Sequence, residues 1–147
     1  MDNKKHKDAF VQGPILPGKI AESIEKHSSM HGIGAHSIFL GQVRADAHEN
    51  GIVEAIEYSC YREMAEAVIH AIREETFSKF QLSCMHIYHS VGRVGAGEIS
   101  LFVFTSSKHR AEAIEACSYV VEEIKKKVPV WGKEILSDQT HTWKNNN

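Results

Sequence analysis

The spacing of hydrophobic positions changes repeatedly along the chain, which predicts strands and helices in turn. Strand-like spacing predicts extended segments at 33–43, 52–61 and 82–91, each bounded by polar or glycine-containing turns. The segment 98–105 is apolar almost throughout, which is typical of a central strand. Helical spacing predicts a long helix over 62–80, with Met64, Val68, Ala71 and Ile72 on its apolar side.

A second long helix is predicted after residue 105. Ser106 or Ser107 is the expected N-cap, and Pro129 ends the helix. The expected core positions step by three and four residues: Ile114, Cys117, Val121, Ile124 and Val128. A short final strand is expected through Val130, Trp131 and Ile135.

This order predicts the α+β class, with two main helices packed on one face of a largely antiparallel sheet. A shorter helix is expected to begin at Pro17. No linker divides the chain, so 1–147 is predicted to form a single domain. The polar ends, 1–9 and 144–147, are expected to fray.

Composition narrows the class of protein. The formal net charge of −2 predicts neither a nucleic-acid nor a membrane partner, and no apolar run approaches the roughly 20 residues of a membrane span. The charged N-terminus does not resemble a signal peptide, and the three cysteines do not form paired motifs. We therefore expect a soluble, cytoplasmic protein.

Basic residues recur at the ends of predicted elements. Arg44 leaves a strand next to Gly41, and His109 and Arg110 open the second long helix. Lys125 follows Ile124 and therefore borders the buried face of that helix, where desolvation lowers a lysine pKa. Each of these residues has an ordinary alternative explanation. Arg44 would be a solvated surface arginine, His109 and Arg110 would belong to a serine-capped first turn, and Lys125 would complement the helix dipole. If these residues converge, they form an anion pocket.

The ten histidines do not predict a metal site. His27 and His31 are four residues apart and His31 and His36 five apart. His86 and His89, three apart in a predicted strand, face opposite sides. Neither HExxH nor CxxC accompanies them. We expect no metal and no resident cofactor.

Four motifs in order resemble one family. They are IFLGQVR at 38–44, HSVGRVGAGE at 89–98, SSKHR at 106–110 and KKKVPVWGKE at 125–134. Together they resemble the catalytic (large) subunits of molybdopterin synthase, the MoaE family, from about residue 10 to Trp143.

The resemblance implies an α/β-hammerhead-type fold and a sulfurtransferase activity. It implies a homodimer that forms a heterotetramer with a ubiquitin-like small subunit, whose C-terminal Gly-Gly carries a thiocarboxylate. The sulfur is transferred to cyclic pyranopterin monophosphate, which builds the molybdopterin dithiolene in molybdenum cofactor biosynthesis.

The resemblance also implies roles for individual residues. Lys125 matches the principal catalytic lysine and also contacts substrate. Arg44, His109 and Arg110 match positions that bind the anionic pterin. The channel for the carrier tail is matched by Phe39, Pro129 and Trp131.

Two positions depart from the family pattern. Many members carry a second active-site lysine directly after the tryptophan, where this chain has Gly132, and Lys133 follows one residue later. A shift of one residue in an extended segment turns a side chain to the other face, so the catalytic role of Lys133 is open. Ser90 stands where an arginine is frequent. The departure at Gly132 leaves one alternative: a catalytically impaired module that only binds the carrier.

Overall fold

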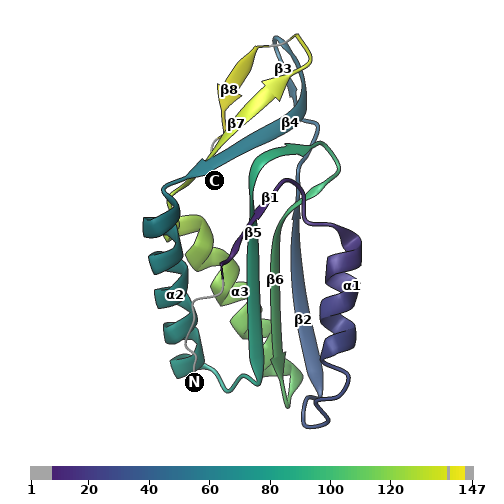
Figure 1. Ribbon diagram of the computed structural model, residues 1–147, viewed down its shortest axis with the longest axis vertical. Helices are drawn as coiled ribbons and strands as arrows, with labels where there is room; N and C mark the ends of the chain where they lie inside the picture. Colours follow the sequence, from purple (N-terminus) through teal and green to yellow (C-terminus); the bar gives the residue numbers. More distant parts are fainter. Residues whose placement is uncertain (1–7, 139, 145–147) are drawn as a thin grey trace.

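The computed structural model describes residues 8–138 and 140–144, which form one α+β unit (Figure 1). The elements in chain order are β1 (Phe10–Gln12), α1 (Pro17–Lys26), β2 (Ala35–Gln42), β3 (Ala47–His48), β4 (Gly51–Cys60), α2 (Arg62–Lys79), β5 (Cys84–Gly95), β6 (Ile99–Ser107), α3 (Arg110–Lys127), β7 (Val130–Leu136) and β8 (His141–Trp143). None of the helices in this part of the chain is long and apolar enough to cross a membrane.

The strands form a sheet in the order β2-β6-β5-β4-β7-β8, and every pair along this path is antiparallel. β1 adds a short parallel pairing to β5, and β3 pairs with β4. The first part of β5 pairs with β6 and its last part with β4, so β5 belongs to both halves of the sheet. In Figure 1, β4, β7, β8 and β3 lie above the lower body. The predicted α+β class with a largely antiparallel sheet is confirmed.

β6 is central, as its apolar sequence predicts, and it is covered on both faces. Leu101 and Val103 pack into the large core beneath α2 and α3. Phe102 and Phe104 point the other way and pack with Ile20 of α1. The two main helices, α2 and α3, share one face as predicted. The shorter α1 covers the other face, because a strand buried on both sides requires a second cover.

The two long helices form where the sequence predicts them, but part of each predicted apolar side is wrong. Met64 of α2 and Ile114 of α3 are exposed. Ala71 of α2 is exposed as well. The predicted positions Ile72, Cys117, Val121 and Ile124 are buried, and small and β-branched residues complete the two buried sides: Ala65, Ile69 and Thr76 in α2, and Ala113, Ala116 and Val120 in α3.

The start of α3 also differs from the prediction. β6 continues to Ser107, which pairs with Ala35 of β2, and the N-cap is His109. The Ser107 hydroxyl still accepts a hydrogen bond from the His109 backbone N–H, at 3.4 Å.

The upper half of the sheet has a core of its own, formed by Val43, Val53, Ile56, Val94 and Leu136. The glycines at 92 and 95 belong to β5, and the reversal comes only at Ala96 and Gly97. Gly92 has φ +86° and pairs with Tyr58, at the point where β5 passes from the lower core to the upper one.

Candidate active site

A small pocket lies where the end of α3 meets the upper half of the sheet. Its walls are formed by Tyr58, His89, Ile124, Lys125, Val128, Val130, Gly132 and Lys144. Its volume is about 20 Å³, enough for a water-sized group but not for a ring system. The pocket therefore accommodates only the narrow end of a ligand.

Lys125 is the cation that the sequence analysis placed at the margin of the core. It lies in the last turn of α3 and follows the buried Ile124. Part of the side chain is exposed, yet it lines the pocket. Burial lowers the pKa of Lys125, and the positive charge of Lys144 lowers it further. Lys125 therefore loses its proton more readily than an exposed lysine does.

His89 forms the inner wall. It is 6% exposed, and its Nδ1–H donates to the Ser90 carbonyl oxygen at 2.8 Å. Since a carbonyl only accepts, Nε2 is the ring nitrogen that carries the free lone pair. Burial lowers the pKa of His89 to about 4, and Lys125 contributes to that shift. A neutral imidazole therefore lies beside Lys125 at physiological pH.

Tyr58 closes the pocket on the side of the upper core. Its ring meets the His89 ring edge-on, with centroids 5.2 Å apart, and its hydroxyl donates to Ser100 Oγ at 3.2 Å. Burial raises the pKa of Tyr58, so the phenol stays protonated. The polar groups of the pocket are thus two lysines, a neutral histidine and a neutral phenol.

Lys144 is a pocket residue that the sequence analysis missed. It follows β8, and its backbone N–H donates to the Gly132 carbonyl oxygen at 2.8 Å. A Cβ built on Gly132 would lie 2.9 Å from Ile56 Cγ2 and 3.6 Å from Lys144 Cβ. Lys144 therefore occupies the space beside Gly132, and a side chain at 132 would clash with Ile56. Only the pairing of β8 with β7, which leaves no motif in the sequence, places Lys144 here.

Lys133 does not line this pocket. In β7 it pairs with Glu57, whereas Gly132 pairs with Tyr58, so the two neighbours face opposite sides. Lys133 Nζ lies 3.5 Å from Glu57 Oε1 and forms an ion pair with it.

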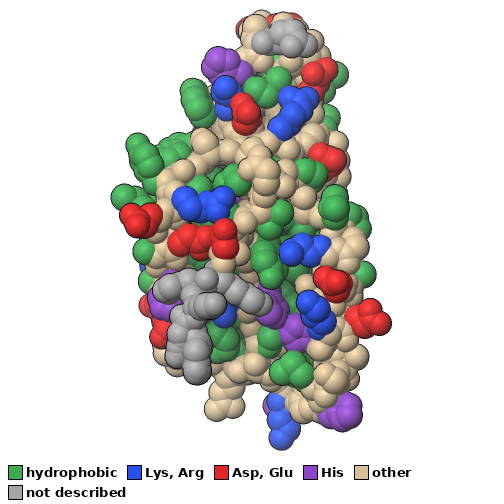
Figure 2. Space-filling view, viewed as in Figure 1, with side chains coloured by type: hydrophobic (Ala, Val, Ile, Leu, Met, Phe, Trp, Pro, Cys, Tyr) green, Lys and Arg blue, Asp and Glu red, His purple; other side chains and the backbone are tan. Residues whose placement is uncertain are grey.

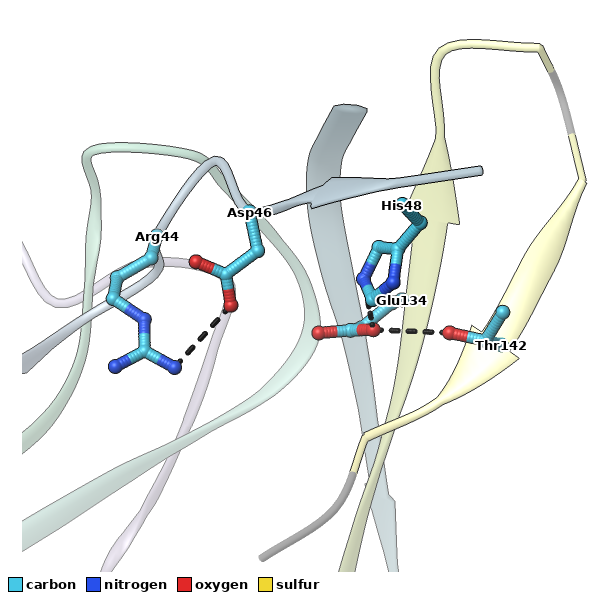
Figure 3. A network of polar contacts seen from close by, with 5 residues as sticks. All are labelled: Arg44, Asp46, His48, Glu134 and Thr142. Carbon is cyan, nitrogen blue, oxygen red and sulfur yellow. Dashed lines mark hydrogen bonds and ion pairs between the residues drawn. The ribbon is translucent and has the colours of Figure 1, made fainter. Parts of the chain in front are cut away.

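A carboxylate network holds β8 against its neighbours. Glu134, which is buried, accepts a hydrogen bond from the Thr142 hydroxyl at 2.9 Å. His48 Nε2 of β3 lies 3.1 Å from the same Glu134 oxygen (Figure 3). This network fixes the strand that carries Lys144.

The other predicted substrate-binding residues, Arg44, His109 and Arg110, do not line this pocket. Arg44 is exposed and pairs with Asp46 at 3.2 Å (Figure 3). His109 caps α3 and Arg110 begins it, fifteen residues before Lys125. At the rise of an α-helix that separation is about 22 Å, so Arg110 and Lys125 lie at opposite ends of α3.

None of the three residues predicted for the tail channel lines the pocket. Phe39 of β2 packs against the large core. Pro129 and Trp131 alternate with the lining residues Val128 and Val130. Trp131 is exposed and meets the Tyr61 ring edge-on at 5.3 Å.

The fold and the pocket together define a class: an α+β protein with a narrow, lysine-bearing pocket suited to an anionic or carbonyl group. Comparison with known proteins identifies the family. The family model "MoaE protein" matches residues 12–127. The chain belongs to the MoaE family.

Individual relatives support this family assignment. The chain is 41% identical over 110 residues to the molybdopterin synthase catalytic subunit of Pyrococcus abyssi, covering 75% of this chain and 73% of that one. It is 35% identical over 113 residues to that of Homo sapiens, covering 77% and 59%. The matched region thus spans less than two thirds of the human relative.

Solved structures show the same fold. Molybdopterin synthase from Staphylococcus aureus superposes with a TM-score of 0.80 at 29% identity, covering 97% of this chain and 99% of that one. A complex of subunits 1 and 2 of the molybdopterin-converting factor from Helicobacter pylori superposes with a TM-score of 0.77 at 18% identity, covering 92% and 88%.

Proposed function

We propose that the pocket around Lys125 is the place where this molybdopterin synthase subunit carries out sulfur transfer. The sulfur leaves the C-terminal thiocarboxylate of a ubiquitin-like small subunit and joins cyclic pyranopterin monophosphate. Two such transfers build the dithiolene. The observation that carries this proposal is Lys125 itself, with a lowered pKa, in a narrow pocket beside neutral His89 and Lys144.

The size of the pocket supports different positions for the two substrates. A volume of about 20 Å³ takes a single water-sized group, so only the terminal atoms of a Gly-Gly tail, which has no side chains, fit beside Lys125, and the pterin rings do not. The tail therefore enters with its terminal carbonyl carbon toward Lys125, and the pterin lies at the mouth.

Lys125 and Lys144 supply positive charge where negative charge develops. Once the sulfur has bonded to a pterin carbon, water attacks the terminal carbonyl carbon of the tail, the C–S bond to the tail breaks, and the tail is left as a carboxylate. Negative charge develops on the carbonyl oxygen during this attack, and an ammonium in a partly desolvated pocket stabilises that charge strongly. Since the pKa of Lys125 is lowered, the same group also transfers protons. His89 Nε2, with its free lone pair, is available to accept a hydrogen bond from Lys125.

Lys144 weighs against the alternative of an impaired binding module. That alternative rests on Gly132, which stands where relatives frequently carry a second lysine. In this chain Lys144 lines the same pocket from the neighbouring strand, and its positive charge lowers the Lys125 pKa. The second positive charge is therefore supplied from a different point in the sequence.

The positions of Arg44, His109 and Arg110 support a homodimer, and with the small subunits a heterotetramer. His109 and Arg110 lie about 22 Å from Lys125 within one chain, too far to share a ligand with it. A twofold arrangement brings the start of α3 of one protomer to the pocket of the other. The phosphate of the pterin is then held by arginines, at least one of them from the partner.

The test is single-turnover conversion of the pterin precursor by the purified chain and a thiocarboxylated Gly-Gly carrier. Lys125→Ala is expected to reduce the rate by about 100-fold or more, the scale of losing one preorganised charge-stabilising group. Lys126→Ala, one residue along and exposed, is the matched control. Equal rates for the two variants would refute the assignment of the pocket.

A further inference from the structure

A second cluster of reactive side chains lies on the opposite face of the sheet from the Lys125 pocket. His27 follows the last turn of α1, and Cys84 and His86 are alternate residues of β5, so both project to the same side. Their donor atoms converge. His27 Nε2 lies 2.8 Å from Cys84 Sγ, His86 Nε2 lies 3.2 Å from Cys84 Sγ, and the two Nε2 atoms are 3.2 Å apart.

A backbone carbonyl of α1 fixes the orientation of the His27 ring. Its Nδ1 lies 2.6 Å from the Ser23 carbonyl oxygen, which can only accept, so Nδ1 carries the hydrogen. The lone pair on Nε2 is thereby aimed at Cys84 and His86. A backbone carbonyl bound to the far nitrogen is the usual support of a metal-ligating histidine.

The three donor atoms lie within 3.2 Å of one another, an arrangement in which all three can share one partner. His27 Nε2 has one lone pair in the ring plane, yet two polar atoms lie within 3.2 Å of it. The thiol is likewise close to both rings. A cation between the three atoms uses all three lone pairs at once.

We infer that His27, Cys84 and His86 bind a divalent cation of the zinc class, with a water molecule as the fourth ligand. Thiolate and imidazole together favour zinc over magnesium or calcium. Tetrahedral zinc keeps such ligand atoms about 3.3 to 3.6 Å apart. When the thiol loses its proton and the metal enters, the His27–Cys84 distance of 2.8 Å needs to open by about 0.8 Å and the two distances of 3.2 Å by about 0.1 to 0.4 Å.

The surroundings suit a structural metal. His27 is buried, and Cys84 and His86 are half-buried. The rings of His27 and His86 both pack around Phe104, with centroids 4.9 and 6.0 Å from it. Figure 2 shows histidine side chains on the lower half of this view, beside the charged side chains that cover α1.

The metal would fasten the end of α1 to β5. α1 is a helix of 10 residues with one buried residue, Ile20, so its own contact with the sheet is small. The ligands face away from His89, which is on the other side of β5. The cation therefore stabilises the fold and takes no part in sulfur transfer.

The experiment is a metal titration of the full-length chain after dialysis against a chelator. Zinc affinity is measured by competition with a chromophoric chelator, and Co²⁺ serves as a spectroscopic probe of thiolate ligation. We expect one equivalent per chain, a thiolate-to-cobalt charge-transfer band, and a higher Tm with zinc. Cys84→Ser removes the band and lowers zinc affinity about 100-fold or more. Cys60→Ser, at another half-buried cysteine, retains both.

Three results would overturn the inference: no stoichiometric binding, a cobalt spectrum without a thiolate band, or a band that survives Cys84→Ser. His86→Gln gives a second route, because it leaves every cysteine in place and still lowers zinc affinity. Circular dichroism of each metal-free variant checks that it folds.

Discussion

His89 illustrates how one buried side chain ties stability to pH. Its pKa in the folded chain is lowered to about 4 by burial, against an ordinary value of 6.5. Below pH 6.5 the unfolded chain takes up a proton at His89, whereas the folded chain does not until the pH approaches 4. Stability from this group is therefore lost as the pH falls through that window.

We expect His89→Gln to remove this dependence. Between pH 7 and pH 5 the wild type should lose about 2 kcal/mol relative to the variant, measured by urea unfolding at each pH. The comparison must be made against the variant, because Glu66 acts in the opposite direction. Burial and a hydrogen bond with Asp8 raise the Glu66 pKa to about 7, so its protonation stabilises the folded chain over the same range. Parallel curves for the two proteins would contradict the prediction.

At the residue scale, the sequence predicted Lys125 but not the rest of its pocket. Lys125 was identified because helical spacing places it next to the buried Ile124, a local property. His89, Tyr58 and Lys144 reach the pocket through strand pairing, which joins residues far apart in the chain. The same limit explains His27, Cys84 and His86, whose contacts join residues up to 59 positions apart.

At the scale of elements, β8 positions the positively charged Lys144, which directly follows it, at the pocket. Its pairing with β7, the Thr142 contact with Glu134 and the backbone hydrogen bond to Gly132 hold Lys144 at the pocket. Lys133, on the same hairpin, is held on the other side by Glu57. The two lysines therefore make a matched pair for experiment.

Lys144→Ala is expected to lower the single-turnover rate by roughly 10-fold, because a positive charge is lost from the transition state. It should also raise the Lys125 pKa, since Lys144 contributes to lowering it. The change of rate with pH that accompanies proton loss from Lys125 should therefore move to higher pH. Lys133→Ala should leave the pH profile in place. A larger effect at Lys133 than at Lys144 would reverse the assignment.

The sequence predicted the existence of the long elements well and their buried sides less well. The predicted strand over 52–61 is observed as β4, where Ile56 and Tyr58 lie inside and Glu57 outside. The helices were harder, because Ala65, Ala113 and Ala116 form the close contacts. Small residues let a helix approach its neighbours, but they carry little hydrophobic signal, so the larger Met64 and Ile114 were assigned to the core in their place.

At the scale of the whole molecule, the α+β class followed from the order of elements, but the cover on the second face of the sheet did not. β6 is apolar on both sides, and nothing in its sequence says which helix covers which side. The long separation of Arg110 from Lys125 has a larger consequence, because it divides the proposed site between two protomers.

Mixed dimers test that division. Lys125→Ala and Arg110→Ala variants, each inactive alone, are mixed and allowed to exchange subunits. If the site is shared across a twofold axis, about one quarter of all sites regain both wild-type residues, and activity returns in proportion. If each site lies within one chain, every site retains a defect and the mixture stays inactive.

The pocket lies where β5 passes from the lower core to the upper core, so its walls come from both. Ile124, Lys125 and Val128 belong to α3 and the lower core, whereas Tyr58 packs on the upper core and Gly132 and Lys144 lie on the hairpin beside it. Gly92 lies at this junction with a backbone conformation that favours glycine. A torsion at a residue outside the pocket wall consequently bears on the distance between Lys125, on the lower side, and Lys144, on the upper side.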